Sequence, residues 1–343
     1  MRRILKPFVL SFFLSGIVVF AGAIFVQAQT GSYRLAKTIS IAGDEGWDYV
    51  AVDSDLRRVY VSHGSHVVVL DADSNSVVGD IPDTQGVHGI AIAADLNRGF
   101  TSNGRADTVT IFDLHTQKVL GTVKTGTNPD AIIYDPATKR VFTMNGRSQD
   151  TTAIEAADGT VAGTIVLGGK PEFAVTNGKG IIYVNIEDKS ELVQFDAKKL
   201  AVLHRWPMAP CKEPSGLAAD WKSHRLFAGC DNQLMAVIDA DSGKVVTTVP
   251  IGDGVDANAF DPETALAFAS TGDGHLTVAH EDSPDKYTVV TNLATKKSAR
   301  TMGLDLKTHR VFLPAAEFDP AAPGERRGKM KAGSFVLLVA SPN

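Results

Sequence analysis

The stretch Asp48-Tyr-Val-Ala-Val-Asp53 returns along the chain as Asp130-Ala-Ile-Ile-Tyr-Asp135 and as Asp256-Ala-Asn-Ala-Phe-Asp261. Each copy sets a polar residue five positions ahead of the Asp that closes a short apolar run. Ser215-Gly-Leu-Ala-Ala-Asp220 and Arg300-Thr-Met-Gly-Leu-Asp305 keep the same frame. The chain is therefore an internal repeat with a period of about 42 residues. The first positions of its seven units, which we call the ring residues, are Asp48, His88, Asp130, Glu172, Ser215, Asp256 and Arg300.

Four short strand signals, separated by turn residues, make up each unit. In the second unit they cover residues 89–93, 98–102, 108–112 and 118–123, and they are rich in β-branched residues. Alternating, β-branched runs of this length are typical of strands. A fixed period of about 40 to 45 residues with four strands per unit indicates a β-propeller, in which each unit forms one blade. The sequence predicts an all-β, seven-bladed β-propeller.

The two ends of the repeat predict how the ring closes. The seventh unit runs from Arg300 to the strand signal at 334–339 and lacks a fourth strand, whereas residues 35–41 have the sequence of a fourth strand with nothing before it. Pairing the two would remove an exposed sheet edge. We expect one propeller domain over residues 34–343, its last blade closed by an N-terminal strand.

The first 28 residues have the pattern of an export signal. Arg2, Arg3 and Lys6 precede an uncharged stretch over residues 8–26, and Val26-Gln27-Ala28 is a plausible cleavage site. We expect residues 1–28 to be a signal peptide. The alternative is an uncleaved N-terminal membrane anchor, because the apolar stretch is near the length that spans a bilayer. A membrane is a partner only in that case, and both readings predict a periplasmic or secreted propeller.

Charge argues against nucleic acid as a partner. The chain has 34 basic and 39 acidic residues, and without the three leader cations the balance is 31 against 39. Nonspecific nucleic-acid affinity requires an excess of cations, which this chain lacks. The basic run at 326–331 is four charges in a Pro/Gly-rich loop, which favours a solvated loop. We expect a monomer that does not bind nucleic acid.

The blade frame gathers the ring residues on one face. In a propeller, the connections from the fourth strand to the next blade and from the second to the third strand share the mouth of the central channel. Ring residues occupy the first connection, and a second set lies fifteen positions further on, with Trp47 adjoining Asp48. The predicted ligand-binding face therefore consists of Asp48, His88, Asp130, Glu172, Asp256, Arg300, His63, Asn103, Asn145, Asn185 and Trp47.

Three interpretations of this face are open. Its carboxylates, amides and imidazoles can hydrogen-bond a polar ligand whose anionic end meets Arg300, or hold a divalent cation. A cation held by some of Asp48, Asp130, Glu172 and Asp256 could polarise a lactone carbonyl. Alternatively, each ring residue caps its own strand or lines a water-filled channel. Trp47 either stacks on a ligand or packs between the first and last blades. No catalytic residue, metal or cofactor is assigned.

The units resemble the YVTN family of β-propeller repeats, and the whole chain resembles a secreted YncE-type protein. Arg58-Val59-Tyr60-Val61, Asn128-Pro129-Asp130-Ala131 and Gly252-Asp253-Gly254-Val255-Asp256 carry the likeness, which covers residues 34–343. It implies the propeller fold but little about activity, because relatives include DNA-binding proteins, lactonases and subunits of redox enzymes. We expect an exported binding or scaffold protein that recognises a small ligand or a protein. A metal-assisted lactone hydrolase and a DNA-binding propeller are the alternatives.

Cys211 and Cys230 are the two cysteines of the chain. An even count in an exported protein favours a disulfide, and the blade frame sets both residues on the ring-residue face of the fifth unit. Their sequence surroundings also look like a pairing found in this subgroup of the family. We expect a structural disulfide, with a reactive or metal-binding thiol pair as the alternative.

Overall fold

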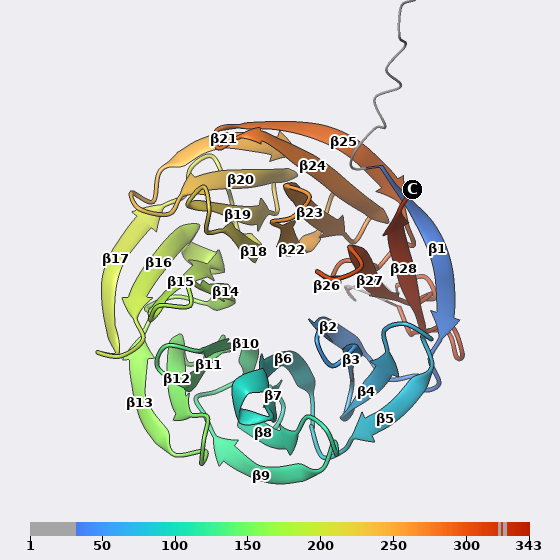
Figure 1. Ribbon diagram of the computed structural model, residues 1–343, viewed down its shortest axis with the longest axis horizontal. Helices are drawn as coiled ribbons and strands as arrows, with labels where there is room; N and C mark the ends of the chain where they lie inside the picture. Colours follow the sequence, from blue (N-terminus) through green and yellow to red (C-terminus); the bar gives the residue numbers. More distant parts are fainter. Residues whose placement is uncertain (1–31, 322–323, 325–327) are drawn as a thin grey trace, which may run out of the picture. The chain divides into compact units, whose positions relative to one another are not determined.

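The computed structural model describes residues 32–321, 324 and 328–343. Its strands form seven four-stranded sheets arranged in a ring (Figure 1), which confirms the all-β, seven-bladed propeller. The expected leader, residues 1–28, lies outside the described residues. Within the described part of the chain, no helix has the length and apolar character needed to cross a bilayer.

Blades one to four follow one another along the chain, each with its first strand nearest the channel. Blade one is β2 (Trp47–Asp53), β3 (Arg58–His63), β4 (His66–Asp71) and β5 (Val77–Ile81). Blade two is β6 (Val87–Ala93), the short 3₁₀ helix η1 (Ala94–Leu96), β7 (Arg98–Asn103), β8 (Thr108–Asp113) and β9 (Val119–Lys124). Blade three is β10 (Pro129–Asp135), β11 (Arg140–Asn145), β12 (Asp150–Glu155) and β13 (Val161–Val166). Blade four is β14 (Pro171–Thr176), β15 (Ile181–Ile186), η2 (Glu187–Lys189), β16 (Glu191–Asp196) and β17 (Ala201–Pro207).

Blades five to seven complete the ring. Blade five is β18 (Pro214–Asp220), β19 (Arg225–Cys230), β20 (Leu234–Asp239) and β21 (Val245–Pro250). Blade six is β22 (Val255–Asp261), β23 (Leu266–Thr271), β24 (His275–Ser283) and β25 (Lys286–Ala294). Blade seven is β26 (Gly303–Asp305), β27 (Arg310–Ala315), β28 (Val336–Pro342) and the N-terminal β1 (Tyr33–Ser40).

The ring closes with its own N-terminal strand, as the sequence predicts. β1 pairs antiparallel with β28 from Tyr33 opposite Pro342 to Ser40 opposite Val336, which gives the sheet order β1-β28-β27-β26 (Figure 1). Tyr33 is buried at the start of this strand, and its hydroxyl donates to the carbonyl of His309. The first and last segments of the propeller are thereby joined in one blade.

The core lies between the blades. The third residue of the second strand is a buried aromatic in all seven blades, and these residues are Tyr60, Phe100, Phe142, Tyr183, Phe227, Phe268 and Phe312. Burying one such side chain contributes roughly 1.5–3 kcal/mol, so this repeated position is a main source of blade-to-blade cohesion.

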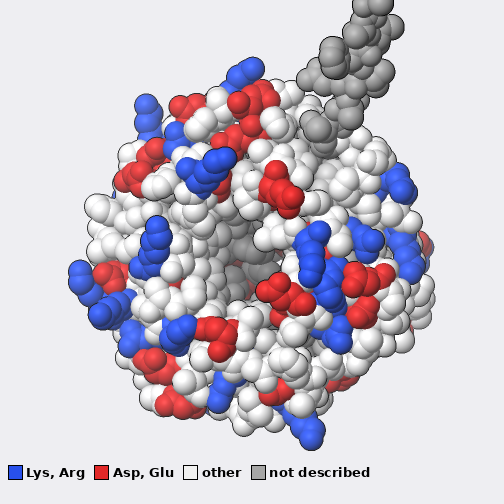
Figure 2. Space-filling model, in the orientation of Figure 1, with Lys and Arg blue, Asp and Glu red and all other residues white. Residues whose placement is uncertain are grey.

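The turns on the face opposite the ring residues are capped locally. The Asp53 carboxylate accepts the backbone N–H groups of Asp55 and Leu56 at 3.0 and 2.8 Å. The Asp71 carboxylate does the same for Ser74 at the next turn of the blade. These carboxylates satisfy the backbone of their own turns. Figure 2 shows positive and negative side chains interspersed over the face in view, around a hollow at the centre of the ring.

Candidate functional site

A β-bulge sets the direction of the ring residues. The pairing of the first and second strands skips between Trp47 and Val50 in blade one, and the same shift occurs in the next five blades. A bulge leaves a residue out of the ladder and re-aims its side chain. The freed backbone N–H of Asp48 donates to the Ser62 hydroxyl at 2.8 Å. The bulge therefore turns the ring residues toward the channel mouth without leaving this backbone donor unpaired.

Five ring residues form one connected network. His88 Nδ1 lies 2.6 Å from the Asp48 carboxylate and 3.8 Å from that of Asp130. Arg300 lies 3.8 Å from Asp48 and 3.1 Å from Asp256. Every pair in this network joins different blades, so the network spans the channel mouth.

Of the two remaining ring residues, Ser215 of blade five contacts this network, and Glu172 of blade four lies near enough to Asp130 for its charge to act. The Ser215 hydroxyl donates to Asp256 at 2.9 Å. Glu172 pairs with the Lys170 ammonium at 2.6 Å, and this ammonium also contacts Glu187. The structure thus brings the predicted residues Asp48, His88, Asp130, Glu172, Asp256 and Arg300 to one place.

Two aromatic rings meet across the channel beside these charges. The ring centroids of Tyr49 and Phe173 are 4.7 Å apart, with a tilt of 38° between the planes. Blades one and four are not neighbours in the ring, so this contact crosses the central channel (Figure 1). The Tyr49 hydroxyl lies close enough to Asp130 to lower the pKa of that carboxyl. The pair forms a rigid bridge below the channel mouth.

The sequence analysis missed this bridge, although the repeat contains a signal for it. Tyr49 and Phe173 directly follow their ring residues, and in the other five blades that position holds a small residue. Those five residues are Gly89, Ala131, Gly216, Ala257 and Thr301. Two large rings and five small side chains at the same repeat position indicate that the rings of Tyr49 and Phe173 fill the part of the channel that the five small side chains leave open.

Crowding of charge shifts the proton affinities of the network. Burial and the nearby Asp48 carboxylate raise the pKa of Asp130 to about 6. Burial of the His88 ring opposes its protonation, but the Asp48 hydrogen bond and the Asp130 charge outweigh this and raise its pKa to about 8. Burial and the Asp130 charge also raise the pKa of Glu172, against the effect of Lys170. His88 is therefore mostly protonated at neutral pH, between two carboxylates.

A hollow of about 490 Å³ lies at the channel mouth, next to the ring residues Asp48, His88 and Arg300. Of the residues predicted for the ligand-binding face, Trp47, Asp48, His88 and Arg300 border it. Its other charged and amide side chains are ones that the sequence analysis did not assign to the face, and these are Arg105, Asp107, Asn128 and Arg147. The arginines lie two positions beyond Asn103 and Asn145, on the connections between the second and third strands of blades two and three.

The four predicted residues on the second strands lie inside the blades instead. His63 is stacked on Phe335 with centroids 4.5 Å apart. Asn103 donates to Thr108 and Thr110, Asn145 to Asp150 and Thr152, and Asn185 to the carbonyls of Ser215 and Gly216. All four are buried and hold their neighbouring strands and loops together. The structure does not bring these side chains to the hollow.

Trp47 packs against the last blade. Its ring lies 5.1 Å from that of Phe335 and 5.8 Å from that of Phe318. This is the packing alternative of the sequence analysis, and the same side chain also borders the hollow. Trp47 therefore forms a fixed wall of the hollow.

The expected disulfide joins Cys211 and Cys230, whose Cα atoms are 5.4 Å apart. Both cysteines are buried, next to Met208 and Leu217. The bond ties the entry loop of blade five to the end of its second strand. This confirms the disulfide prediction over a free thiol pair.

One group among the described residues has the spacing of metal ligands. Ligand atoms of Asp48, His88 and Asp130 all lie within 4.8 Å of one another. Two carboxylates and one imidazole suit a divalent transition metal such as Zn²⁺ or Mn²⁺. In this structure the His88 nitrogen that faces Asp48 takes part in their hydrogen bond.

No family model matches the chain, and no curated protein matches it. Among solved structures, the WD40 repeats of RRP9 align with a TM-score of 0.77 and 9% identity, over 91% of this chain and 100% of that one. A chain of the mitotic checkpoint complex aligns with a TM-score of 0.74 and 16% identity, over 98% and 99%. The fold is that of the WD40 β-propellers. Hydrazine synthase of Kuenenia stuttgartiensis aligns with a TM-score of 0.68 and 14% identity, over 80% of this chain and 94% of that one. At these identities the likeness extends to the fold alone.

Proposed function

We propose that the protein is an exported, YncE-type binding propeller that recognises a small polar ligand, or a side chain of a partner protein, at the channel mouth. One observation carries the proposal: the hollow of about 490 Å³ opens onto Asp48, His88 and Arg300, which three different blades supply. A concave site with a few convergent polar groups is the usual form of a small-molecule site.

The ring network favours recognition over catalysis. His88 lies between two carboxylates, and Arg300 lies between Asp48 and Asp256. Groups held in this way are pre-organised for hydrogen bonding, which reduces the entropy lost when a ligand binds. The hydroxyl of Ser215 donates to the Asp256 carboxylate and not to a histidine, so the described residues do not form the usual Ser–His pair of a nucleophile at this position.

Two further observations support the rest of the proposal. The basic and apolar leader pattern and the Cys211–Cys230 disulfide both suit an oxidising compartment outside the cytoplasm. One structural neighbour belongs to the mitotic checkpoint complex, which is a protein assembly, and this suits a scaffold role. The YVTN-like repeat motifs support the assignment to the YncE type.

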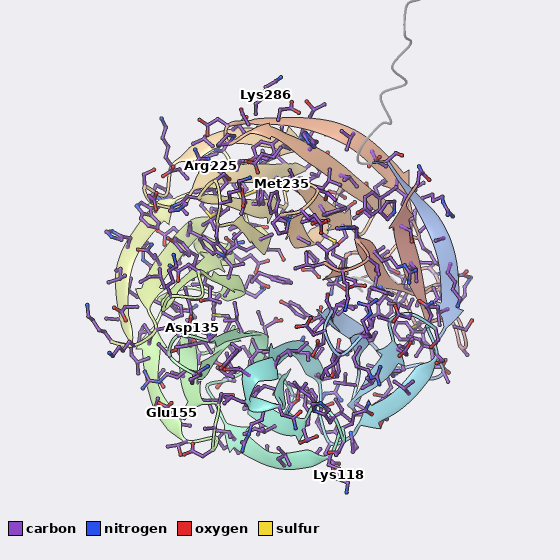
Figure 3. The ribbon with its side chains drawn as sticks, viewed as in Figure 1. Lys118, Asp135, Glu155, Arg225, Met235 and Lys286 are labelled. Atoms are coloured by element: carbon purple, nitrogen blue, oxygen red, sulfur yellow. A yellow bond between two sulfur atoms is a disulfide. The ribbon has the colours of Figure 1, made fainter. Side chains whose placement is uncertain are left out.

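A ligand screen with matched variants tests this function. The full-length chain, isolated from its exported fraction, is screened by thermal shift against polar metabolites and against extracts of its own compartment. We expect binders whose affinity falls at least about tenfold in Asp48→Asn or His88→Gln, since each change removes a charge-assisted hydrogen bond. Lys118→Ala, at the outer edge of blade two (Figure 3), is the control that keeps the affinity. Binders whose affinity is unchanged in Asp48→Asn and in His88→Gln would contradict the proposal.

A metal-assisted lactone hydrolase is the second candidate, because Asp48, His88 and Asp130 have the spacing of metal ligands. A divalent cation held there would act as a Lewis acid on a lactone carbonyl. The test is metal analysis of the isolated protein, followed by lactone hydrolysis assays with added Zn²⁺ or Mn²⁺. Stoichiometric metal and turnover that Asp130→Asn abolishes would favour this candidate. Absence of both metal and turnover would eliminate it.

A further inference from the structure

Arg105 and Arg147 occupy the same turn position in neighbouring blades. Each is the second residue after the end of its blade's second strand, β7 or β11, and each ends a repeated Asn-Gly-Arg sequence. The glycine before each arginine donates its backbone N–H to the entry loop of the blade, at the carbonyl of Gly86 in blade two and of Asn128 in blade three, at 2.9 Å in both. The two arginines therefore extend from turns that are held in the same way.

In the other five blades, the side chain at this turn position binds the entry loop of its own blade. These five residues are Ser65, Asp188, Asn232, Asp273 and Glu317. Their partners are the Glu45 carboxylate, the backbone N–H groups of Lys170, Lys212 and Asp253, and the Lys296 ammonium. None of the five is a cation, so blades two and three depart from the repeat both in charge and in contact.

Arg105 and Arg147 have no such structural role. In blade three, the Ser148 hydroxyl and the Asp107 carboxylate accept backbone N–H groups of the entry loop, at 2.9 and 2.7 Å. Both arginines are exposed, and within the part of the chain that the structure describes neither guanidinium has a hydrogen bond or an ion pair. Their donors are available to a ligand.

Both arginines border the hollow at the channel mouth, where positive charge exceeds negative charge. The lining contains Arg105, Arg147 and Arg300 against Asp48 and Asp107, although the whole chain has a net charge of −5. Both aspartates already have hydrogen-bond partners within the protein. A concave surface with an excess of one charge raises the local concentration of ions of the opposite charge. The hollow therefore favours an anion.

The chemistry of the two side chains narrows the kind of anion. A guanidinium presents its donors in a planar fork that matches a carboxylate or a phosphate with two parallel hydrogen bonds. Two such groups on adjacent blades suit a ligand with more than one negative charge. A hollow of about 490 Å³ has the size of a site for a small molecule.

We propose that the turns after β7 and β11 form an oxyanion site at the hollow, in which Arg105 and Arg147 bind a small, multiply charged anion, either a polycarboxylate or a phosphate ester. This inference rests on the proposed function, because it names the ligand class for the same hollow. It adds two residues of the second-to-third strand turns to the ring residues Asp48, His88 and Arg300.

Anions and their neutral analogues test the site with the full-length chain. The carboxylate pair is succinate and succinamide, the phosphate pair is glycerol 3-phosphate and glycerol, and putrescine is the dication. Calorimetry at low salt measures the affinities. We expect at least one anion to bind about tenfold or more tightly than its neutral analogue and than putrescine, and to weaken as NaCl is added, because salt screens exposed charges. The two pairs distinguish a carboxylate ligand from a phosphate ligand.

Variants of the two arginines assign the binding to this turn position. Arg105→Gln with Arg147→Gln should weaken the anion by about tenfold to a hundredfold, since each change removes charge-assisted hydrogen bonds. Arg105→Lys with Arg147→Lys should give an intermediate affinity, because lysine keeps the charge but loses the planar fork. Arg34→Gln is the matched control: Arg34 is exposed on β1, away from the hollow, and its loss changes the net charge equally.

Three results would overturn the oxyanion site. They are equal affinity of each anion and its neutral analogue, anion binding that is unchanged in the double Gln variant, and anion binding that Arg34→Gln weakens as much as Arg105→Gln does. The proposed function still stands in these cases if the wider screen finds a ligand that depends on Asp48 and His88. If that screen finds none, both proposals fail. An anion whose affinity depends on the two arginines but is unchanged in Asp48→Asn and His88→Gln would support the oxyanion site and contradict the proposed role of the ring residues.

Discussion

The imidazole of His88 lies 2.6 Å from the carboxylate of Asp48, and this hydrogen bond joins blade two to blade one at the channel mouth. Burial of the ring opposes its charge, but Asp48 and the nearby Asp130 hold the proton and raise the pKa of His88 to about 8. The ordinary value is 6.5, so the folded protein binds this proton more tightly than the unfolded chain does.

Stability should therefore depend on pH through His88. Because the folded pKa is the higher one, the stabilising contribution is complete below about pH 6.5 and is lost as the pH rises through about 8. Its size is up to about 2 kcal/mol, because each tenfold difference in proton affinity is equivalent to about 1.36 kcal/mol. Urea unfolding at pH 6 and pH 9 gives the difference in the free energy of unfolding between the two pH values. In His88→Gln the part of that difference that comes from His88 should be absent. His224→Gln, exposed on the opposite face, should keep the wild-type difference, and an unchanged difference in His88→Gln would contradict the assignment.

The bridge between Tyr49 and Phe173 should stabilise the ring. Phe173→Ala removes a ring contact that crosses the channel, and we expect a loss of about 2–4 kcal/mol in the free energy of unfolding. Exposed Leu120 provides the control, since Leu120→Ala should cost less than about 0.5 kcal/mol. Urea unfolding at pH 8 measures both.

Tyr49→Phe tests the hydroxyl separately. The Tyr49 hydroxyl favours the ionised form of Asp130, so without it the pKa of Asp130 should rise further above about 6. Asp130 is ionised above that pH, and we expect a loss of about 1–3 kcal/mol there and a smaller loss near pH 4. Equal losses at both pH values would show that the hydroxyl does not act on Asp130.

The repeat frame made the fold predictable from sequence. Asp48, Asp130 and Asp256 stand about two and three repeat periods apart, which indicated the number of blades and their common face. The missing fourth strand after Arg300 pointed to closure by the N-terminal segment. These inferences depend only on period and strand order. Topology then leaves few choices, because a propeller removes its exposed edges by closing.

The chemistry of the mouth was less predictable, for a physical reason. Asp48 and Asn103 both lie at loops of the same face, but a bulge turns Asp48 into the channel, whereas Asn103 pairs with threonines inside its blade. Side-chain direction depends on these local backbone shifts, which the repeat pattern does not encode. Arg105 was missed because it lies two positions beyond Asn103, and the sequence analysis considered only the position of Asn103 on that connection.

The Cys211–Cys230 disulfide should contribute to stability mainly by lowering the conformational entropy of the unfolded chain. The bond closes a loop with a sequence separation of 19 residues, for which the chain-entropy model gives about 3 kcal/mol. Urea unfolding with and without reductant should show a loss of this order. The double variant Cys211→Ala with Cys230→Ala should be destabilised to the same degree and should not respond to reductant. A wild-type protein that does not respond to reductant would contradict the prediction.

Tyr33 should be the strongest single anchor of the closing strand. Its ring packs edge-on against Phe268 of blade six with centroids 5.3 Å apart, and its hydroxyl donates to the carbonyl of His309 at 2.8 Å. Tyr33→Ala removes both contacts and leaves a cavity, so we expect a loss of about 3–5 kcal/mol in the free energy of unfolding. Lys37→Ala, on the exposed side of the same strand, should change it by less than about 0.5 kcal/mol.

Hydrogen exchange provides a second measurement: Tyr33→Ala should speed exchange of the β1 and β28 amides before those of blades two to four, because the pairing of β1 with β28 holds the ring closed. Uniform acceleration in all blades would show that the ring opens as a whole and that Tyr33 has no special part in its closure.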